Sequence, residues 1–224
     1  MDFEVLAAED SPIGMICLRR RDSRGQSAFE ITVDHQFLMS SLVTASERAL
    51  AERAVARHGG RALSVLIGGL GLGYTAHAAL AAPSVARVEV VELLPQVIGW
   101  LERGLIPLAA ELLADRRLNV GQGDVYRRLL EEPTTRYDAI LLDVDTSPDR
   151  RLSETSAPFY TEAGLRAAAR HLAPRGWLGV WSFAASPELE AALRAVFARV
   201  EVEPVSFLNE MLGEGETNWL YFAG

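Results

Sequence analysis

Residues 64–73 read Ser64-Val65-Leu66-Ile67-Gly68-Gly69-Leu70-Gly71-Leu72-Gly73, an apolar run that breaks directly into glycines. A strand that ends in glycines lets backbone N–H groups approach a ligand closely at a helix N-terminus. A second apolar run, residues 88–91, closes on the acid Glu92. An acid about twenty residues beyond the glycines, at the tip of the next strand, suits the two hydroxyls of a ribose. The pair predicts a cofactor that contains a nucleoside.

Outward from this stretch, apolar strand patterns alternate with helical patterns. We expect strands at 62–67, 86–92, 118–121, 137–143, 177–182, 199–205 and 218–223. Helices are expected near 74–81, 95–102, 105–114, 124–131, 159–172 and 187–197. Such alternation predicts an α/β fold with a doubly wound, mostly parallel sheet of seven strands. The connection 206–217 is short and lacks helical periodicity, so the last strand is expected to pair antiparallel.

The first 36 residues follow a different pattern. Short apolar or alternating runs at Phe3–Ala7, Ile13–Leu18 and Phe29–Val33 are separated by turn-forming and charged residues. This pattern is typical of a β-meander. From residue 37 to 57 the apolar spacing becomes helical. We therefore divide the chain into an N-terminal β-meander, 1–36, and an α/β domain, 37–224.

Composition excludes several classes of function. The chain has 224 residues, a formal net charge of −8 and a single cysteine, Cys17. An internal disulfide is therefore impossible, and a general nucleic-acid binder would show a basic face. The four histidines lack ligand spacing, so we expect no metal. We see no signal peptide or membrane span, and we expect a cytoplasmic protein with no membrane or nucleic-acid partner.

Carboxylates follow the predicted parallel strands at the edge where such sheets bind ligands. They are Glu92, Asp124, Asp143 and Asp145. Asp124 also suits the N-cap of a helix that starts at Val125. Four acids at one edge repel each other unless something cationic or hydrogen-bonding lies between them. The edge is therefore expected to bind a ligand that is cationic or that donates hydrogen bonds.

Several segments resemble the spermidine synthase family, whose members are aminopropyltransferases with a class I methyltransferase-like Rossmann fold. The resemblance lies in Val65–Tyr74, in Val90–Pro95, in Gly123-Asp124-Val125 and in Tyr137–Asp143. Phe159-Tyr160 and Leu172–Leu178 are similar to later landmarks of the family. The resemblance covers about residues 37–182 and implies transfer of an aminopropyl group from decarboxylated S-adenosylmethionine to a small amine.

The resemblance also implies roles for individual residues. Gly68, Gly69, Gly71, Gly73, Glu92, Gly123, Asp124 and Asp143 would bind the cofactor, with Glu92 on the ribose and Asp124 on the adenine amino group. Asp143 and Asp145 would be catalytic, and Asp145, Thr146 and Tyr160 would bind the amine substrate. The cofactor is expected to be decarboxylated or intact S-adenosylmethionine, giving methylthioadenosine or S-adenosylhomocysteine. We expect a homodimer, because the N-terminal hairpins offer strand edges.

The chain departs from the family in its glycine loop, after the strand at 137–143, and at residues 42–48, which replace a stretch that carries glutamine and tyrosine in the family. Leu72 stands where the family's glycine loop usually carries an acid that holds the aminopropyl amine, and Thr146 stands at the second of two aspartates. Three alternatives stay open. The chain is a methyltransferase that uses intact S-adenosylmethionine, a nicotinamide-dependent oxidoreductase, or a non-catalytic nucleoside-binding or interaction module.

Overall fold

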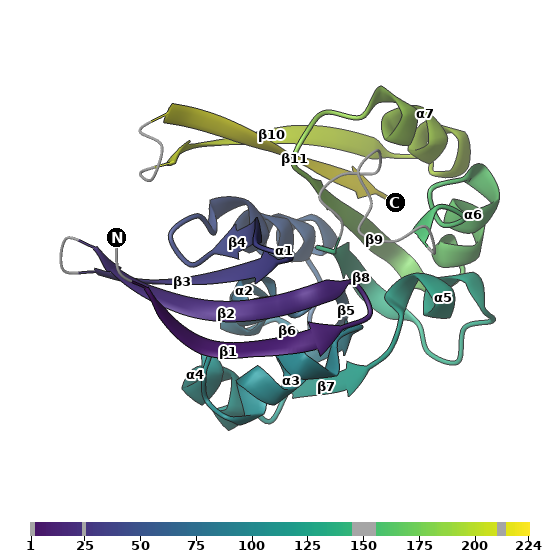
Figure 1. Ribbon diagram of the computed structural model, residues 1–224. Helices are drawn as coiled ribbons and strands as arrows, with labels where there is room; N and C mark the ends of the chain where they lie inside the picture. The colour runs from purple at the N-terminus through teal and green to yellow at the C-terminus, as the bar shows by residue number, and fades with distance from the viewer. Residues whose placement is uncertain (1–2, 24–25, 145–155, 210–213) are drawn as a thin grey trace.

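The protein is described by a computed structural model, which covers residues 3–23, 26–144, 156–209 and 214–224. Asp145 and Thr146 lie outside these residues. The described chain forms two sheets with helices around the larger one (Figure 1). No helix among the described residues is long and apolar enough to cross a membrane.

The N-terminal sheet has four antiparallel strands in sequence order: β1 (Glu4–Ser11), β2 (Gly14–Ser23), β3 (Gln26–Val33) and β4 (Gln36–Ser40). A two-residue turn joins β3 to β4, and both of its residues, Asp34 and His35, have positive φ. Positive φ at both central positions is the geometry whose twist suits a hairpin. The β-meander predicted for this part of the chain is thus present, with one strand more than expected.

The helix predicted over 37–57 is wrong in its first turns. Residues 36–40 pair with β3 as β4, and the helix α1 (Ala45–His58) begins later. Leu38 and Leu42 have helical spacing, but the turn before them places residues 36–40 against β3, where the backbone gains ladder hydrogen bonds. The helix ends where expected, because Gly59 adopts the left-handed conformation and donates its N–H to the carbonyl of Val55 at 3.2 Å.

The larger sheet has seven strands in the order β10-β11-β9-β8-β5-β6-β7. Its strands are β5 (Leu63–Gly68), β6 (Val85–Glu92), β7 (Leu118–Gln122), β8 (Tyr137–Leu142), β9 (Leu172–Ser182), β10 (Val200–Asn209) and β11 (Glu214–Ala223). Strands β5 to β9 pair in parallel, and β11 pairs antiparallel with both β9 and β10, as expected for the last strand. The strand order reverses between β5 and β8, which marks the ligand-binding edge of such a sheet.

Helices cover both faces of this sheet. They are α2 (Tyr74–Ala81), α3 (Pro95–Glu102), α4 (Ala109–Ala114), α5 (Val125–Leu130), α6 (Glu162–Ala169) and α7 (Pro187–Val196), besides α1. Alternate residues of β5 point to opposite cores: Val65 and Ile67 pack with α1 and α2, and Leu66 packs with α5 and α6. The doubly wound, mostly parallel seven-stranded sheet is therefore confirmed.

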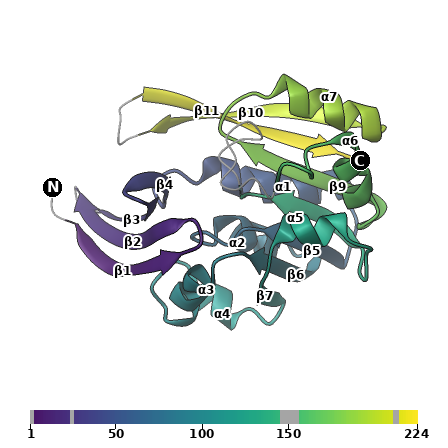
Figure 2. The same cartoon turned by 45° about the vertical axis from the view of Figure 1, so that its right-hand side comes forward.

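The N-terminal sheet lies beside the larger one and shares its core. Ile16, Leu18 and Ile31 belong to the same apolar cluster as the α1 face of the larger sheet. Polar contacts tie β1 to α3, because the side chain of Glu9 accepts hydrogen bonds from Trp100 at 2.9 Å and Arg103 at 2.8 Å. In Figures 1 and 2 the β10–β11 hairpin reaches out on the same side as this sheet.

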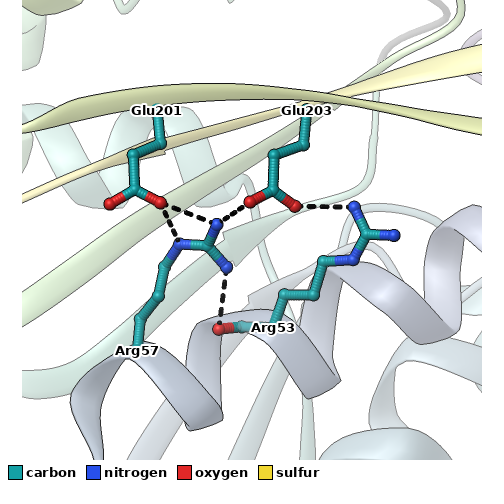
Figure 3. Close-up of polar contacts among 4 residues, drawn as sticks. All are labelled: Arg53, Arg57, Glu201 and Glu203. Atoms are coloured by element: carbon teal, nitrogen blue, oxygen red, sulfur yellow. Dashed lines mark hydrogen bonds and ion pairs between the residues drawn. The ribbon is translucent and has the colours of Figure 1, made fainter.

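Two arginines of α1 hold the β10–β11 hairpin. Arg57 donates to Glu201 at 2.8 Å and also to Glu203, while Arg53 donates to Glu203 at 2.6 Å (Figure 3). The Arg57 guanidinium also lies 3.9 Å from the ring centroid of Phe222 on β11. Because residues of a strand alternate between faces, the side of β10 that carries these acids also carries Phe207. We call Arg53, Arg57, Glu201 and Glu203 the α1–β10 clamp.

Candidate active site

A cavity of about 440 Å³ opens at the carboxyl ends of the parallel strands. Its lining comes from the N-terminal sheet, the edge of the larger sheet, α1, α2 and the β10–β11 hairpin. Among the described residues that line it, five are carboxylates: Glu47, Glu92, Asp124, Asp143 and Glu216. Its apolar wall includes Ile13, Ile16, Phe37, Met39, Trp181, Phe183 and Phe207. A small-molecule site typically combines an apolar lining with a few polar groups in this way.

Two glycines of the loop after β5 face the cavity. Gly69 and Gly71 both line it, with φ of 90° and 52°. A Cβ on Gly69 would lie 2.5 Å from the carbonyl oxygen of Asp143, so that no side chain fits there. The predicted close approach of backbone to ligand is thus available at these two positions.

The other two glycines of this loop serve packing. A Cβ on Gly68 would lie 2.7 Å from Val125, and one on Gly73 would lie 2.5 Å from Leu112. Gly73, with φ of 88°, also provides the N-cap of α2. Neither glycine lines the cavity. Leu72 is fully buried in the core, so this loop position points away from the cavity.

Glu92 ends β6 as predicted and lies on the cavity wall, only 7% exposed. Its carboxyl oxygens accept backbone N–H groups from Leu70 at 2.7 Å and from Leu94 at 2.8 Å. Burial raises the pKa of Glu92, and these backbone donors oppose the rise. Each carboxylate oxygen has a second lone pair. Glu92 therefore shapes the glycine loop from its place on the cavity wall.

Asp124 caps α5, which confirms the helix-capping role predicted from the sequence. Its Oδ1 accepts the backbone N–H groups of Tyr126 at 2.9 Å and Arg127 at 3.2 Å. Asp124 and Gly123 both line the cavity, and the cap does not use Oδ2. The capping role and a ligand-binding role are thus compatible, because they need different oxygens.

Asp143 follows β8 directly and lines the cavity. Thr75, at the start of α2, donates its hydroxyl to Asp143 Oδ2 at 2.7 Å. Burial raises the pKa of Asp143 to about 6, and the Thr75 hydrogen bond opposes this rise. A carboxyl group with a pKa close to neutrality is suited to accept and release a proton during a reaction.

The sequence analysis missed Glu47. This residue lies in the first turn of α1, is 8% exposed and lines the cavity. Burial and the charge of Asp143 raise its pKa to about 7. The Ser46 hydroxyl lies 2.9 Å from both Glu47 Oε2 and Asn218 Oδ1. The one available signal was an acid in the first turn of a helix, far from any predicted strand tip.

Tyr160, predicted to bind the amine, is half-buried and does not line the cavity; its hydroxyl lies 2.9 Å from that of Tyr126, which does. Asp145, predicted as catalytic and substrate-binding, lies outside the described residues together with Thr146. The structure thus brings together Gly69, Gly71, Glu92, Gly123, Asp124 and Asp143 from the predicted set.

The charge of the site is one-sided. Among the described residues of the lining, none is an arginine, a lysine or a histidine. Buried carboxylates are unfavourable unless hydrogen bonds or opposite charges satisfy them. No group of three or more metal-ligating side chains occurs among the described residues. The arrangement can bind a polar ligand of nucleoside size and an ammonium group, and it can accept a proton at Asp143.

Comparisons with known proteins point in the same direction. No protein-family model matches the chain. The chain is 34% identical over 124 residues to a protein named Polyamine aminopropyltransferase 2 from Streptomyces coelicolor. That match covers 54% of this chain but only 22% of the relative. The sequence likeness supports the resemblance to the spermidine synthase family.

Two solved structures share the fold. A spermidine synthase in complex with the transition-state analogue AdoDATO superposes with a TM-score of 0.77 at 18% identity, covering 98% of this chain and 73% of that one. The spermidine synthase from Thermotoga maritima gives a TM-score of 0.74 at 16% identity, covering 98% and 71%. The expected fold, a methyltransferase-like α/β domain with a small N-terminal sheet, is confirmed.

Proposed function

We propose that this chain, a divergent relative of the spermidine synthases, transfers an aminopropyl group from decarboxylated S-adenosylmethionine to a small amine. The observation that carries the proposal is the cavity at the strand tips. Of its described lining residues, five are carboxylates and none carries a positive charge. Both substrates of this reaction are cations that offer hydroxyl, amino or ammonium groups to such carboxylates.

The acids proposed to bind the nucleoside lie at the carboxyl ends of the neighbouring strands β6 and β7. Glu92, at the tip of β6, is proposed to accept hydrogen bonds from the two ribose hydroxyls. Asp124 Oδ2, which the helix cap does not use, is proposed to accept from the adenine amino group. Gly69 and Gly71 line the cavity together with Asp143, and the sulfonium end of the donor is proposed to lie beside them.

The chemical step is a displacement at the carbon next to sulfur. The acceptor nitrogen attacks that carbon, the C–S bond breaks, and its electron pair stays on sulfur, giving neutral methylthioadenosine. The new nitrogen–carbon bond leaves a proton to remove, and Asp143 is the proposed base. A neutral thioether leaves without acid assistance, so the protein mainly aligns the lone pair with the breaking bond and takes the proton.

The electrostatics of the cavity favour the decarboxylated donor over intact S-adenosylmethionine. Intact S-adenosylmethionine carries a carboxylate that would enter a cavity already lined by Glu47 and Asp143. The position two residues before Gly69, where many methyltransferases place an acid for the methionine amino group, is Ile67, fully buried in the core. Calorimetry with both donors decides between them, and a preference for the intact form would favour methyl transfer.

A turnover assay tests the proposal. Protein, decarboxylated S-adenosylmethionine and a panel of primary amines and diamines are incubated, and methylthioadenosine is quantified by chromatography. We expect release that depends on protein and on one class of amine. Binding of the donor without release across the panel would favour the non-catalytic alternative.

We also propose that the protein is a homodimer that pairs through β1. This strand is one edge of the N-terminal sheet. Phe3, just before it, and Val5, within it, are 54% and 51% exposed. An exposed apolar edge strand is a template for pairing with a second chain. Light scattering after gel filtration measures the mass, and a monomer at micromolar concentration would contradict this proposal.

A further inference from the structure

Glu47 lies in a helix and not at the tip of a strand, unlike Glu92 and Asp143. It comes from α1, which precedes the whole α/β sheet, and it reaches the cavity that Asp143 lines from β8. Its side chain is held in place, because Oε2 lies 2.9 Å from the Ser46 hydroxyl and that hydroxyl lies 2.9 Å from Asn218 Oδ1 on β11. Three of these groups are buried: Ser46 is 1% exposed, Glu47 8% and Asn218 3%.

The groups that face Glu47 leave its charge without a partner ion. Asp143 and Glu216 add negative charge from β8 and β11, while Thr75 and Tyr74 of α2 are neutral. The charge of the neighbouring cation Arg48 lowers the pKa of Glu47, but its guanidinium makes its contacts elsewhere, 4.9 Å from the Tyr74 ring centroid and 3.5 Å from His77 Nδ1. Among the described residues no ion pair joins Arg48 to Glu47. A buried carboxylate in this setting gains most from a cation that a ligand brings.

The proposed position of the donor in the cavity indicates which cationic group of the ligand would reach Glu47. Its ribose is placed at Glu92 and its sulfur beside Gly69, Gly71 and Asp143, as proposed above. The chain beyond sulfur therefore runs toward α1 and α2, which pack against each other after the glycine loop. The loop itself offers no acid, because Leu72 is buried in the core.

We propose that Glu47 binds the terminal ammonium group of the aminopropyl chain and so selects a donor that carries this group. The inference rests on the proposed function and adds a specificity-determining residue to it. Asp143 then remains available to the nitrogen of the acceptor. Glu47 holds the transferred group by its far end, away from the carbon that reacts.

Two neutral-sulfur nucleosides isolate this contact. The aminopropyl thioether of adenosine ends in an ammonium group, and the butyl thioether of adenosine ends in a methyl group of similar size. Calorimetry measures the affinity of the wild-type chain for both near pH 7.5, about half a unit above the raised pKa of Glu47. Glu47→Gln is expected to weaken binding of the aminopropyl compound by about 10- to 100-fold, the range for a lost hydrogen bond to a charged group. Binding of the butyl compound is expected to change by less than about twofold.

Two variants serve as controls. Glu52→Gln makes the same chemical change on an exposed position of the same helix and is expected to bind both compounds like the wild type. Glu47→Asp keeps the charge on a shorter arm and is expected to retain part of the preference for the aminopropyl compound. A role of Glu47 in packing alone would not produce this order of affinities.

The outcomes separate this inference from the proposed function. If Glu47→Gln keeps its affinity for the aminopropyl compound, or weakens both compounds equally, the role of Glu47 is refuted while nucleoside binding stands. A wild-type chain that binds the aminopropyl compound no more tightly than the butyl compound refutes it as well. If the wild-type chain binds neither, the proposed function falls and this inference falls with it.

Discussion

Asp143 is held at the centre of the cavity by contacts from both sides. Its backbone N–H donates to the carbonyl of Gly68 at 3.1 Å, and Thr75 donates to its side chain at 2.7 Å. These contacts fix the carboxyl group where the end of β8 meets the glycine loop. The same burial that raises its pKa to about 6 makes it a better base than an exposed aspartate.

Asp143→Asn is expected to lower the rate of methylthioadenosine release by at least about 100-fold, because the amide cannot take the proton. Nucleoside affinity is expected to change little, since the amide keeps the shape of the side chain and an acceptor for Thr75. Steady-state kinetics and calorimetry on the same preparation give both quantities. Unchanged turnover would remove Asp143 from the mechanism.

Ionisation of Glu47 beside Asp143 is expected to lower the free energy of unfolding as the pH rises. The pKa of Glu47 moves from its ordinary 4.5 to about 7 in the folded chain. Below pH 4.5 both states hold the proton, and between about 4.5 and 7 only the folded state does, so its advantage fades as pH rises through this window. Above it, the ionised Glu47 carboxylate costs on the order of 3 kcal/mol.

Thermal melting of the free protein between about pH 5 and pH 8 measures this effect. The melting temperature of the wild type is expected to fall with pH relative to that of Glu47→Gln, which lacks the titration. Glu52→Gln is expected to follow the wild type. Parallel curves for wild type and Glu47→Gln would contradict the interpretation.

At the scale of elements, α1 connects the cavity to β10, the edge strand of the larger sheet. Its first turn carries Glu47, and its last two turns carry Arg53 and Arg57, which hold β10 through the α1–β10 clamp (Figure 3). The hairpin that α1 holds in turn presents Phe207, Glu216 and Asn218 to the cavity. One helix thus supplies the proposed binding group Glu47 and also holds the hairpin that forms part of the cavity wall.

Arg57→Ala is expected to lower the free energy of unfolding by about 1–2 kcal/mol. It removes a partly buried ion pair and a cation–π contact, which together exceed an exposed pair. Hydrogen exchange of the β10–β11 amides should also become faster. Arg61→Ala, at an exposed position just after α1, is the matched control and is expected to change neither. Equal exchange in both variants would show that the clamp does not order the hairpin.

The whole molecule forms the cavity from parts that lie far apart in the chain. The N-terminal sheet, the strand tips of the larger sheet and the C-terminal hairpin each contribute residues to its wall. Ligand binding should therefore stabilise all three parts together, and we expect a single cooperative unfolding transition that moves to higher temperature.

Methylthioadenosine at about 100 times its dissociation constant is expected to stabilise the chain by about 2.7 kcal/mol, which raises the melting temperature by about 5–10 °C. Methylthioinosine lacks the exocyclic amino group that Asp124 is proposed to bind, and it should give a smaller shift. Differential scanning fluorimetry compares the two. No shift with either compound would count against a nucleoside site in this cavity.

Local sequence determined the strands, the glycine loop and the acids at the strand tips, because apolar runs, glycines and their spacing act over a few residues. Thus Val65–Gly73, Glu92, Asp124 and Asp143 were found where the structure has them. Only the tertiary structure decided that Gly69 and Gly71 line the cavity, while a Cβ on Gly68 or Gly73 would meet Val125 or Leu112, which are distant in sequence. Tertiary structure alone also paired residues 36–40 with β3 and brought Glu47, Thr75 and Asn218 to the cavity. These contacts join residues up to 172 positions apart, and no local pattern carries information over that separation.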